Sequence, residues 1–79
     1  MTTLHRARSW KIQVLGREHG VPHFHLWSPN AAAVTAIETL AVLSGSVEAK
    51  ALEEARSWAA GHRGQLIAAW RRLNPEKSQ

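Results

Sequence analysis

The sequence has no cysteine, no aspartate and no long apolar run. Without cysteine, neither a disulfide bond nor a thiolate metal site can form, and a reducing compartment is compatible with this composition. No apolar run approaches the ~18–20 residues that a membrane-spanning helix needs. The basic segment 1–11 is followed by no apolar stretch of the signal-peptide type. We therefore expect a soluble, cytoplasmic protein that does not contact a membrane.

Acidic residues are also few. Ten lysines and arginines oppose six glutamates, which gives a net charge of +4 and a sequence pI of about 10.8. Such an excess favours an anionic partner, either nucleic acid or an acidic protein. The alternative is that the charge only keeps a small domain soluble. A nucleic-acid footprint needs cations clustered on one face, so the sequence leaves both interpretations open.

The length predicts one small domain, residues 1–79, with a polar lead-in at 1–8 and a loose tail at 75–79. A chain of this size buries only roughly 60% of the surface that it exposes when unfolded. Four tryptophans help to fill the core, because each can bury on the order of 200 Å². A homodimer would be a second way to gain buried surface.

Alternation of apolar and polar residues predicts the first strands. In residues 10–15, Trp10, Ile12 and Val14 share the face that we expect to point inward. A loop with two glycines and a closing proline follows, and it leads into a second strand at 23–27.

The next strand signals are weaker. We expect a third strand at 33–38 and a fourth at 40–43; the alternatives at their junction are a bulge or one long bent strand. The Ser44-Gly45-Ser46 stretch is predicted to end the sheet.

Two helices complete the predicted fold. Ser46 is expected to cap a helix at 47–60, and a second helix at 62–73 ends at Asn74-Pro75. The fold class is α+β: a small antiparallel sheet of three to four strands, followed by a C-terminal αα-hairpin packed on one face.

The densest chemistry lies in residues 18–25, which read EHGVPHFH and hold three of the five histidines. Alternate residues of a strand point to the same side, so His23, His25 and Trp27 should share a face. One short element would then present two imidazoles that can donate, accept, take up a proton or bind a metal. We predict that the functional site lies here.

One interpretation of this cluster is acid–base catalysis on RNA. His23 or His25 would be the general base or acid, with His19 as the counterpart. Arg17 would clamp the phosphate, and Glu18 would orient a histidine. This is the set of groups that a metal-independent ribonuclease needs, and it requires no cofactor.

A second interpretation is a divalent-metal site. A His-x-His pair on a strand can hold a metal, and imidazole with carboxylate suits zinc, nickel, copper or iron. The first two ligands would be His23 and His25. The candidates for the third ligand are His19, which we place first, Glu18, His62 and Glu38.

A third interpretation involves no reaction. The histidines could bond backbone carbonyls and fix the loop, or line an interface. Trp27 shares their face and could stack on a base or fill a pocket of a partner. The protein would then be a non-enzymatic module that binds protein, RNA or DNA.

The stretch from Glu18 to Leu26 resembles the signature of the bacterial domain-of-unknown-function 4160 family. Segments 40–45 and 58–66, with Trp70, also fit the layout of that family, so the resemblance covers about residues 8–74. The motif positions that carry over are His19, Pro22, His23 and His25. The family more often has a second proline where this chain has Val21.

Proteins of that family are commonly encoded beside a member of the domain-of-unknown-function 2442 family, and the pair is suspected of being a toxin–antitoxin module. The resemblance therefore implies a bacterial protein bound to a small, antitoxin-like partner. It supplies no established reaction. The leading hypothesis from the sequence is a toxin-like ribonuclease, and the alternatives are a binding partner or regulator and a histidine-ligated metal domain.

Overall fold

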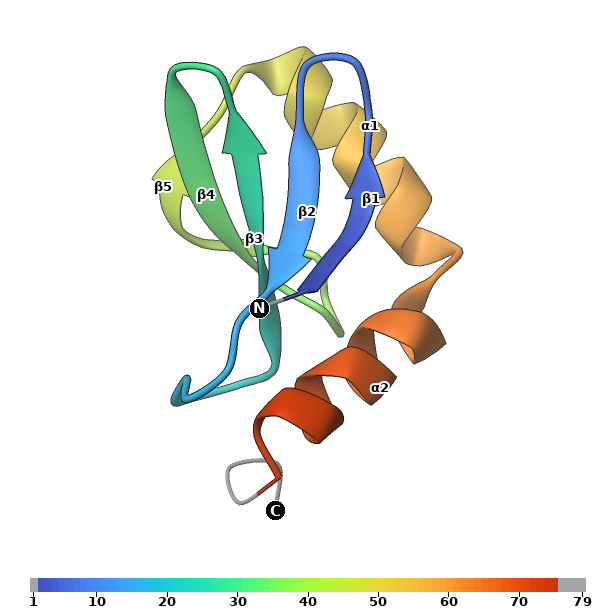
Figure 1. Ribbon diagram of the computed structural model, residues 1–79. Coiled ribbons are helices and arrows are strands. Elements are labelled where there is room, and N and C mark those ends of the chain that lie inside the picture. Colours follow the sequence, from blue (N-terminus) through green and yellow to red (C-terminus); the bar gives the residue numbers. More distant parts are fainter. Residues whose placement is uncertain (1, 76–79) are drawn as a thin grey trace.

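The structure of the protein, a computed structural model, describes residues 2–75, which form five strands followed by two helices (Figure 1). The strands are β1 (Thr2–Arg6), β2 (Lys11–Val14), β3 (His23–Ser28), β4 (Ala31–Ala36) and β5 (Val42–Ser46). The helices are α1 (Ala49–Ala60) and α2 (Arg63–Leu73). The α+β fold class is confirmed, with more strands than the three to four predicted.

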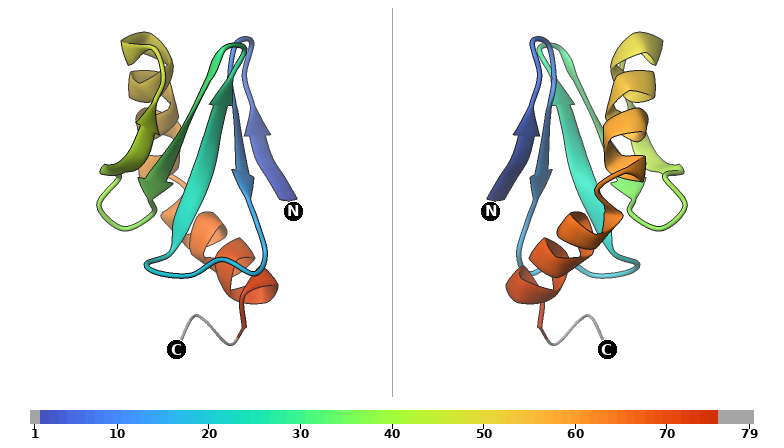
Figure 2. Two further views of the ribbon diagram at one scale, coloured as in Figure 1. Left: turned by 90° about the vertical axis from the view of Figure 1, so that its left-hand side faces the viewer. Right: turned by 90° about the vertical axis from the view of Figure 1, so that its right-hand side faces the viewer.

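The strands form one sheet in the order β1-β2-β3-β4-β5, and each strand is antiparallel to its neighbours. Both helices lie on the same side of this sheet, and they meet at an angle (Figure 2). The opposite side carries no second layer among residues 2–75. The sheet therefore has a core face toward the helices and an uncovered face.

The core lies between the sheet and the helices. On β2 and β3, four large side chains are fully buried: Ile12, Val14, Phe24 and Leu26. The helices contribute small alanines from α1 and larger side chains from α2 to this core: Ala51, Ala55, Ala59, Leu66 and Trp70. Each large side chain contributes about 1.5–3 kcal/mol through burial. Trp10, Ile12 and Val14, which were predicted to point inward, are all buried, so the facing of the first predicted strand is confirmed. Gln13 and His23, on the other face, are also largely shielded.

Residues 1–8 were predicted to be a polar lead-in, but Thr2–Arg6 form the strand β1. This edge strand pairs with β2, from Thr2 opposite Val14 to Arg6 opposite Lys11. Its five residues have no clean apolar alternation, so pairing with β2 rather than local pattern determines the strand. Of the predicted tail at 75–79, residues 76–79 lie outside the described residues.

The predicted boundaries of the last strands also need correction. β4 begins at Ala31, directly after a turn, and β5 runs over Val42–Ser46, which includes the segment predicted to end the sheet. Gly45 explains this: its φ is 75°, and a Cβ there would lie 2.3 Å from the carbonyl oxygen of Ala32. The glycine permits a close approach of two strands, which the sequence pattern presents as a stop.

Helix α1 begins later than predicted, and Ser46 does not cap it. The N-cap residue is Glu48, whose side chain makes no capping hydrogen bond. At the other end of the helical layer, α2 ends at Leu73 and its C-cap is Asn74, as the Asn-Pro pair predicts. Within residues 2–75, no helix combines the length and apolarity needed to cross a bilayer.

Candidate functional site

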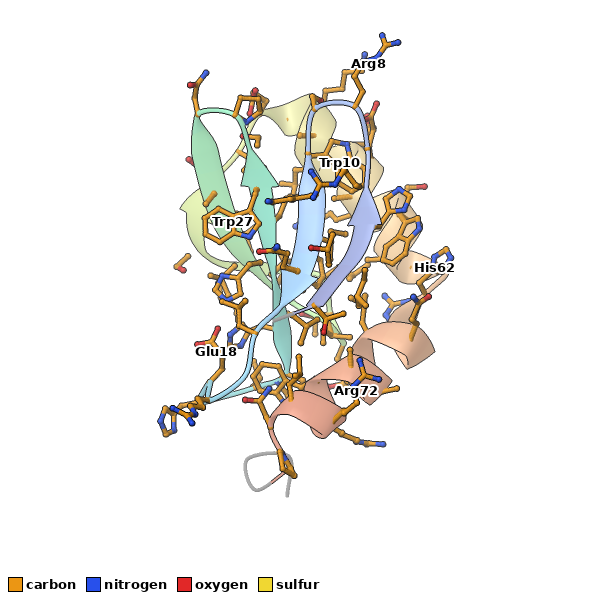
Figure 3. The ribbon with its side chains drawn as sticks, in the orientation of Figure 1. Arg8, Trp10, Glu18, Trp27, His62 and Arg72 are labelled. Atoms are coloured by element: carbon orange, nitrogen blue, oxygen red, sulfur yellow. The ribbon has the colours of Figure 1, made fainter. Side chains whose placement is uncertain are left out.

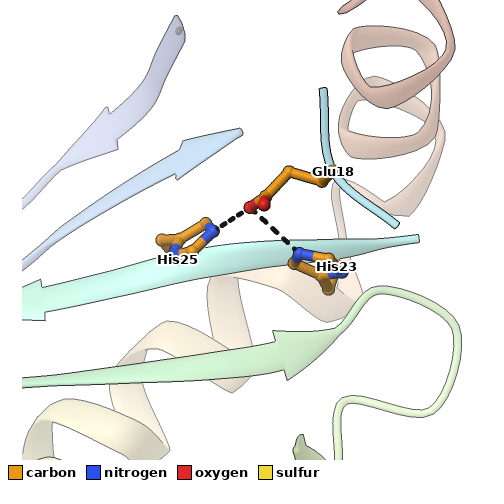
Figure 4. Close-up of side chains that lie close together, drawn as sticks. All are labelled: Glu18, His23 and His25. Atoms are coloured by element: carbon orange, nitrogen blue, oxygen red, sulfur yellow. Dashed lines mark hydrogen bonds and ion pairs between the residues drawn. The ribbon is translucent and has the colours of Figure 1, made fainter. Parts of the chain in front are cut away.

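Three side chains meet on the uncovered face at the start of β3 (Figure 4). His23 and His25 lie two residues apart on that strand, so both imidazoles leave the same face. The preceding loop brings Glu18 back over them. Oε1 of Glu18 lies 2.5 Å from Nε2 of His25 and 3.2 Å from Nε2 of His23.

The hydrogen-bond partners of His23 fix its tautomer. Nδ1 lies 2.8 Å from the carbonyl oxygen of Val21. A carbonyl only accepts, so Nδ1 carries a hydrogen and a neutral His23 has a lone pair on Nε2. That lone pair faces the carboxylate of Glu18 at 3.2 Å. Two acceptors at this distance repel each other unless a proton or a cation lies between them.

The cluster is shielded from solvent but not sealed. The exposed fraction of the side chain is 10% for His23, 17% for His25 and 27% for Glu18. Burial raises the pKa of the Glu18 carboxyl, but hydrogen bonds from His25 and His23 and the positive charge of those rings outweigh it. The net result is a pKa below the ordinary value of 4.5. Glu18 is therefore a carboxylate at neutral pH.

A buried amide holds the loop that carries Glu18. Oδ1 of Asn74 accepts the backbone N–H of Glu18 at 2.8 Å. Its Nδ2 donates to the carbonyl oxygens of Leu15 at 3.0 Å and Trp70 at 3.1 Å. Only 2% of Asn74 is exposed. Asn74, at the end of α2, therefore holds the loop both at Leu15, where it starts, and at Glu18.

Tryptophans flank both imidazoles. The ring of His23 lies 4.7 Å from that of the buried Trp70, and the ring of His25 is stacked near that of Trp27 at 6.0 Å and 14°. These contacts restrict ring rotation, so the Nε2 atoms keep their direction toward Glu18.

The structure separates the sequence-predicted residues into two groups. Glu18, His23 and His25 each place a ligand atom within 4.8 Å of the others. His19 lies outside this group and is exposed, and so is Arg17, whose φ is 60°. The third group beside the two histidines is therefore Glu18, whereas His19, the first candidate from the sequence, lies outside the cluster.

The more distant candidates do not join the cluster. His62 contacts the carbonyl oxygen of Trp58 through Nδ1 at 2.7 Å, so it caps the end of α1. Glu38 is exposed at the turn after β4. Sequence reasoning missed Asn74 as part of the site, since the Asn-Pro pair signals only the end of a helix.

Comparison with protein families matches residues 10–71 to the family described as Domain of unknown function (DUF4160). The chain belongs to this family. No curated protein and no solved structure matches it. The part that matches DUF4160 includes Glu18, His23 and His25, and it ends before Asn74.

Proposed function

We propose that this DUF4160 protein is a divalent-metal-binding domain whose centre is formed by Glu18, His23 and His25. One observation carries the proposal. Two imidazole Nε2 atoms and a carboxylate oxygen converge, while Nδ1 of His23 is already committed to the carbonyl oxygen of Val21. Either a proton or a metal cation has to lie between Nε2 of His23 and the carboxylate, and a metal ion would bind Nε2 of His25 at the same time.

One separation and one hydrogen bond in the cluster match a metal site, whereas the 2.5 Å between Oε1 of Glu18 and Nε2 of His25 must widen for both atoms to bind one ion. Two ligands bound to one ion at ~2.0–2.1 Å lie about 3 Å apart, close to the separation of Oε1 of Glu18 from Nε2 of His23. Histidine ligands usually donate the other ring N–H to a carbonyl or carboxylate, which fixes the tautomer. The bond from His23 to Val21 is such a bond.

The ligand set also limits the metal and its chemistry. Two imidazoles and one carboxylate suit zinc, iron(II) or nickel, and three protein ligands leave positions open for water or substrate. A metal held in this way can polarise a phosphoryl or carbonyl oxygen and lower the pKa of a bound water. His25 and Glu18, the more exposed members, border the side from which a substrate would approach.

The test is metal binding by protein that carries no histidine tag. Metal-free protein is titrated with Zn²⁺, Ni²⁺ and Mn²⁺ by calorimetry at pH 7.5, where Glu18 is ionised. We expect one equivalent of Zn²⁺ or Ni²⁺ to bind. We expect His23→Ala, His25→Ala and Glu18→Gln each to weaken that binding at least tenfold.

His19→Ala is the matched control. It removes an imidazole next to Glu18 in sequence, but from an exposed position outside the cluster. It should leave affinity within twofold of the parent. Less than a tenth of an equivalent of bound metal, or an equal loss in His19→Ala, contradicts the proposal.

Metal-independent ribonuclease activity stays a prediction from the sequence. Its two supporting residues, His19 and Arg17, are exposed and outside the cluster, so the geometry favours the metal centre. RNA cleavage that continues in excess chelator and is lost in His25→Ala would reverse this preference. The toxin role, the small partner protein and the homodimer also stay predictions.

A further inference from the structure

We propose that the uncovered face of the sheet binds single-stranded nucleic acid. Arg6, Arg8 and Lys11 would contact phosphates, and a base would stack on Trp27. The binding itself requires no metal. The placement of the bound strand beside the Glu18–His25 centre rests on the proposed function.

The register of the sheet places the binding groups in one row. Arg6 lies opposite Lys11 in the β1–β2 pair, and Lys11 lies opposite Trp27 in the β2–β3 pair. Residues directly opposite each other in a sheet point to the same face. The next residues, Ile12 and Leu26, are fully buried toward the helices, so this row points to the uncovered face.

The row continues into the candidate metal centre. His25 is two residues from Trp27 on the same strand, roughly 7 Å along it, and the two rings are nearly parallel. Figure 3 looks onto this face and shows Trp27 and Glu18 on the same side of the sheet. A chain laid over Trp27 therefore reaches Glu18 without turning around an edge.

The charges of this region suit a polyanion. Arg6, Arg8, Lys11 and Trp27 line a shallow pocket of about 310 Å³. None of these three cations forms an ion pair within residues 2–75. Two carboxylates near the pocket, Glu48 and Glu54, accept hydrogen bonds from neutral side chains.

Those carboxylates accept hydrogen bonds from residues that also line the pocket. Ser28 donates to Glu48 at 3.0 Å, and the indole N–H of Trp10 donates to Glu54 at 2.9 Å. Both carboxylates keep their negative charge, but neither forms an ion pair with Arg6, Arg8 or Lys11. Phosphates can therefore supply the opposite charge to these cations.

Trp27 adds an aromatic ring on which an unpaired base can stack, which the cations alone do not provide. It lies on a central strand of the sheet, yet 36% of it is exposed. An aromatic platform beside cations is the combination by which proteins bind single strands, because every unpaired base has a face to stack. A duplex hides those base faces, so it can use only the cations.

The experiment measures binding of a labelled mixed-sequence 12-nucleotide RNA to metal-free protein by fluorescence anisotropy, at several salt concentrations. DNA of the same sequence and the corresponding RNA duplex are separate arms. We expect Trp27→Ala, Lys11→Glu and Arg6→Glu each to weaken single-strand binding at least fivefold. Trp27→Phe keeps a stacking ring and should retain most of the affinity.

Lys50→Glu is the charge-matched control. Lys50 is exposed on α1, in the helical layer, and its substitution changes the net charge as Lys11→Glu does. It should change affinity less than twofold. Because no metal is present, failure of the metal proposal leaves this test intact.

Three outcomes overturn the proposal. The first is an equal loss in Lys50→Glu and Lys11→Glu, which would show attraction by net charge alone. The second is full affinity in Trp27→Ala, or a duplex bound as tightly as the single strand. The third is an acidic peptide that competes as well as RNA, which would make this face a protein-binding surface.

Discussion

The backbone N–H of Glu18 and the side-chain oxygen of Asn74 form a 2.8 Å hydrogen bond across 56 residues of sequence. The asparagine is buried and also donates to two carbonyl oxygens. A helix end and a loop are therefore fixed together by one amide, and the carboxylate of the candidate metal centre depends on that contact.

Asn74→Ala tests this dependence. It leaves buried backbone groups without partners, so we expect a loss of about 1–3 kcal/mol in unfolding free energy. We also expect metal affinity to fall about tenfold, measured well below the melting temperature, since supporting residues typically cost 10–100-fold. Asn74→Asp keeps the acceptor for Glu18 but turns a carboxylate oxygen toward the carbonyl oxygens of Leu15 and Trp70, so we expect it to destabilise the protein as well. Unchanged affinity in folded Asn74→Ala would mean that Asn74 only caps α2.

The pH dependence of stability should reveal the paired state of Glu18. Its pKa in the folded protein is below the ordinary 4.5, because hydrogen bonds from His25 and His23 outweigh its burial. Its contribution to stability is therefore complete above pH 4.5 and is lost as pH falls through the lower, folded pKa. In metal-free protein, the melting temperature of the parent should exceed that of Glu18→Gln at pH 6–7, and the gap should close below pH 4.5. A constant gap from pH 3 to 7 would refute this.

Gly45 should tolerate no side chain. Its φ is 75°, and a Cβ would come within 2.3 Å of the carbonyl oxygen of Ala32. Gly45→Ala should lower unfolding free energy by at least about 2 kcal/mol, from left-handed backbone strain and the contact together. Gly64, in α2, has open space where its Cβ would be. There Gly64→Ala should raise stability by up to about 1 kcal/mol. Similar losses at both sites in thermal melts would contradict this account.

Thr35 carries a hydroxyl that the core does not satisfy. The residue is fully buried in β4, and Oγ1 has no hydrogen-bond partner within residues 2–75. Thr35→Val keeps the shape and removes the polar group, so we expect a gain of about 1 kcal/mol in chemical denaturation. Thr35→Ser keeps the hydroxyl and loses a methyl, and it should destabilise the protein. A loss of stability in Thr35→Val would show that the hydroxyl does have a partner.

Local patterns determined the parts of this protein that depend on neighbours in sequence. Alternation alone placed Ile12 and Val14 in the core, and it put His23 and His25 on one face. A period of two is a property of the strand itself, so it needs no information from elsewhere in the chain. The end of α2 was predictable for the same reason, since Asn-Pro acts on its own backbone.

Only the tertiary structure decided the rest. β1 and β5 have weak local patterns and form because β2 and β4 offer them hydrogen-bonding edges. The loop after β2 could have turned either His19 or Glu18 toward the histidines, and the distant Asn74 settles the choice by holding the backbone of Glu18. The row of Arg6, Lys11 and Trp27 comes from three strands, so it exists only once their register is set. Contacts between distant segments depend on the whole packed chain, and no local pattern encodes them.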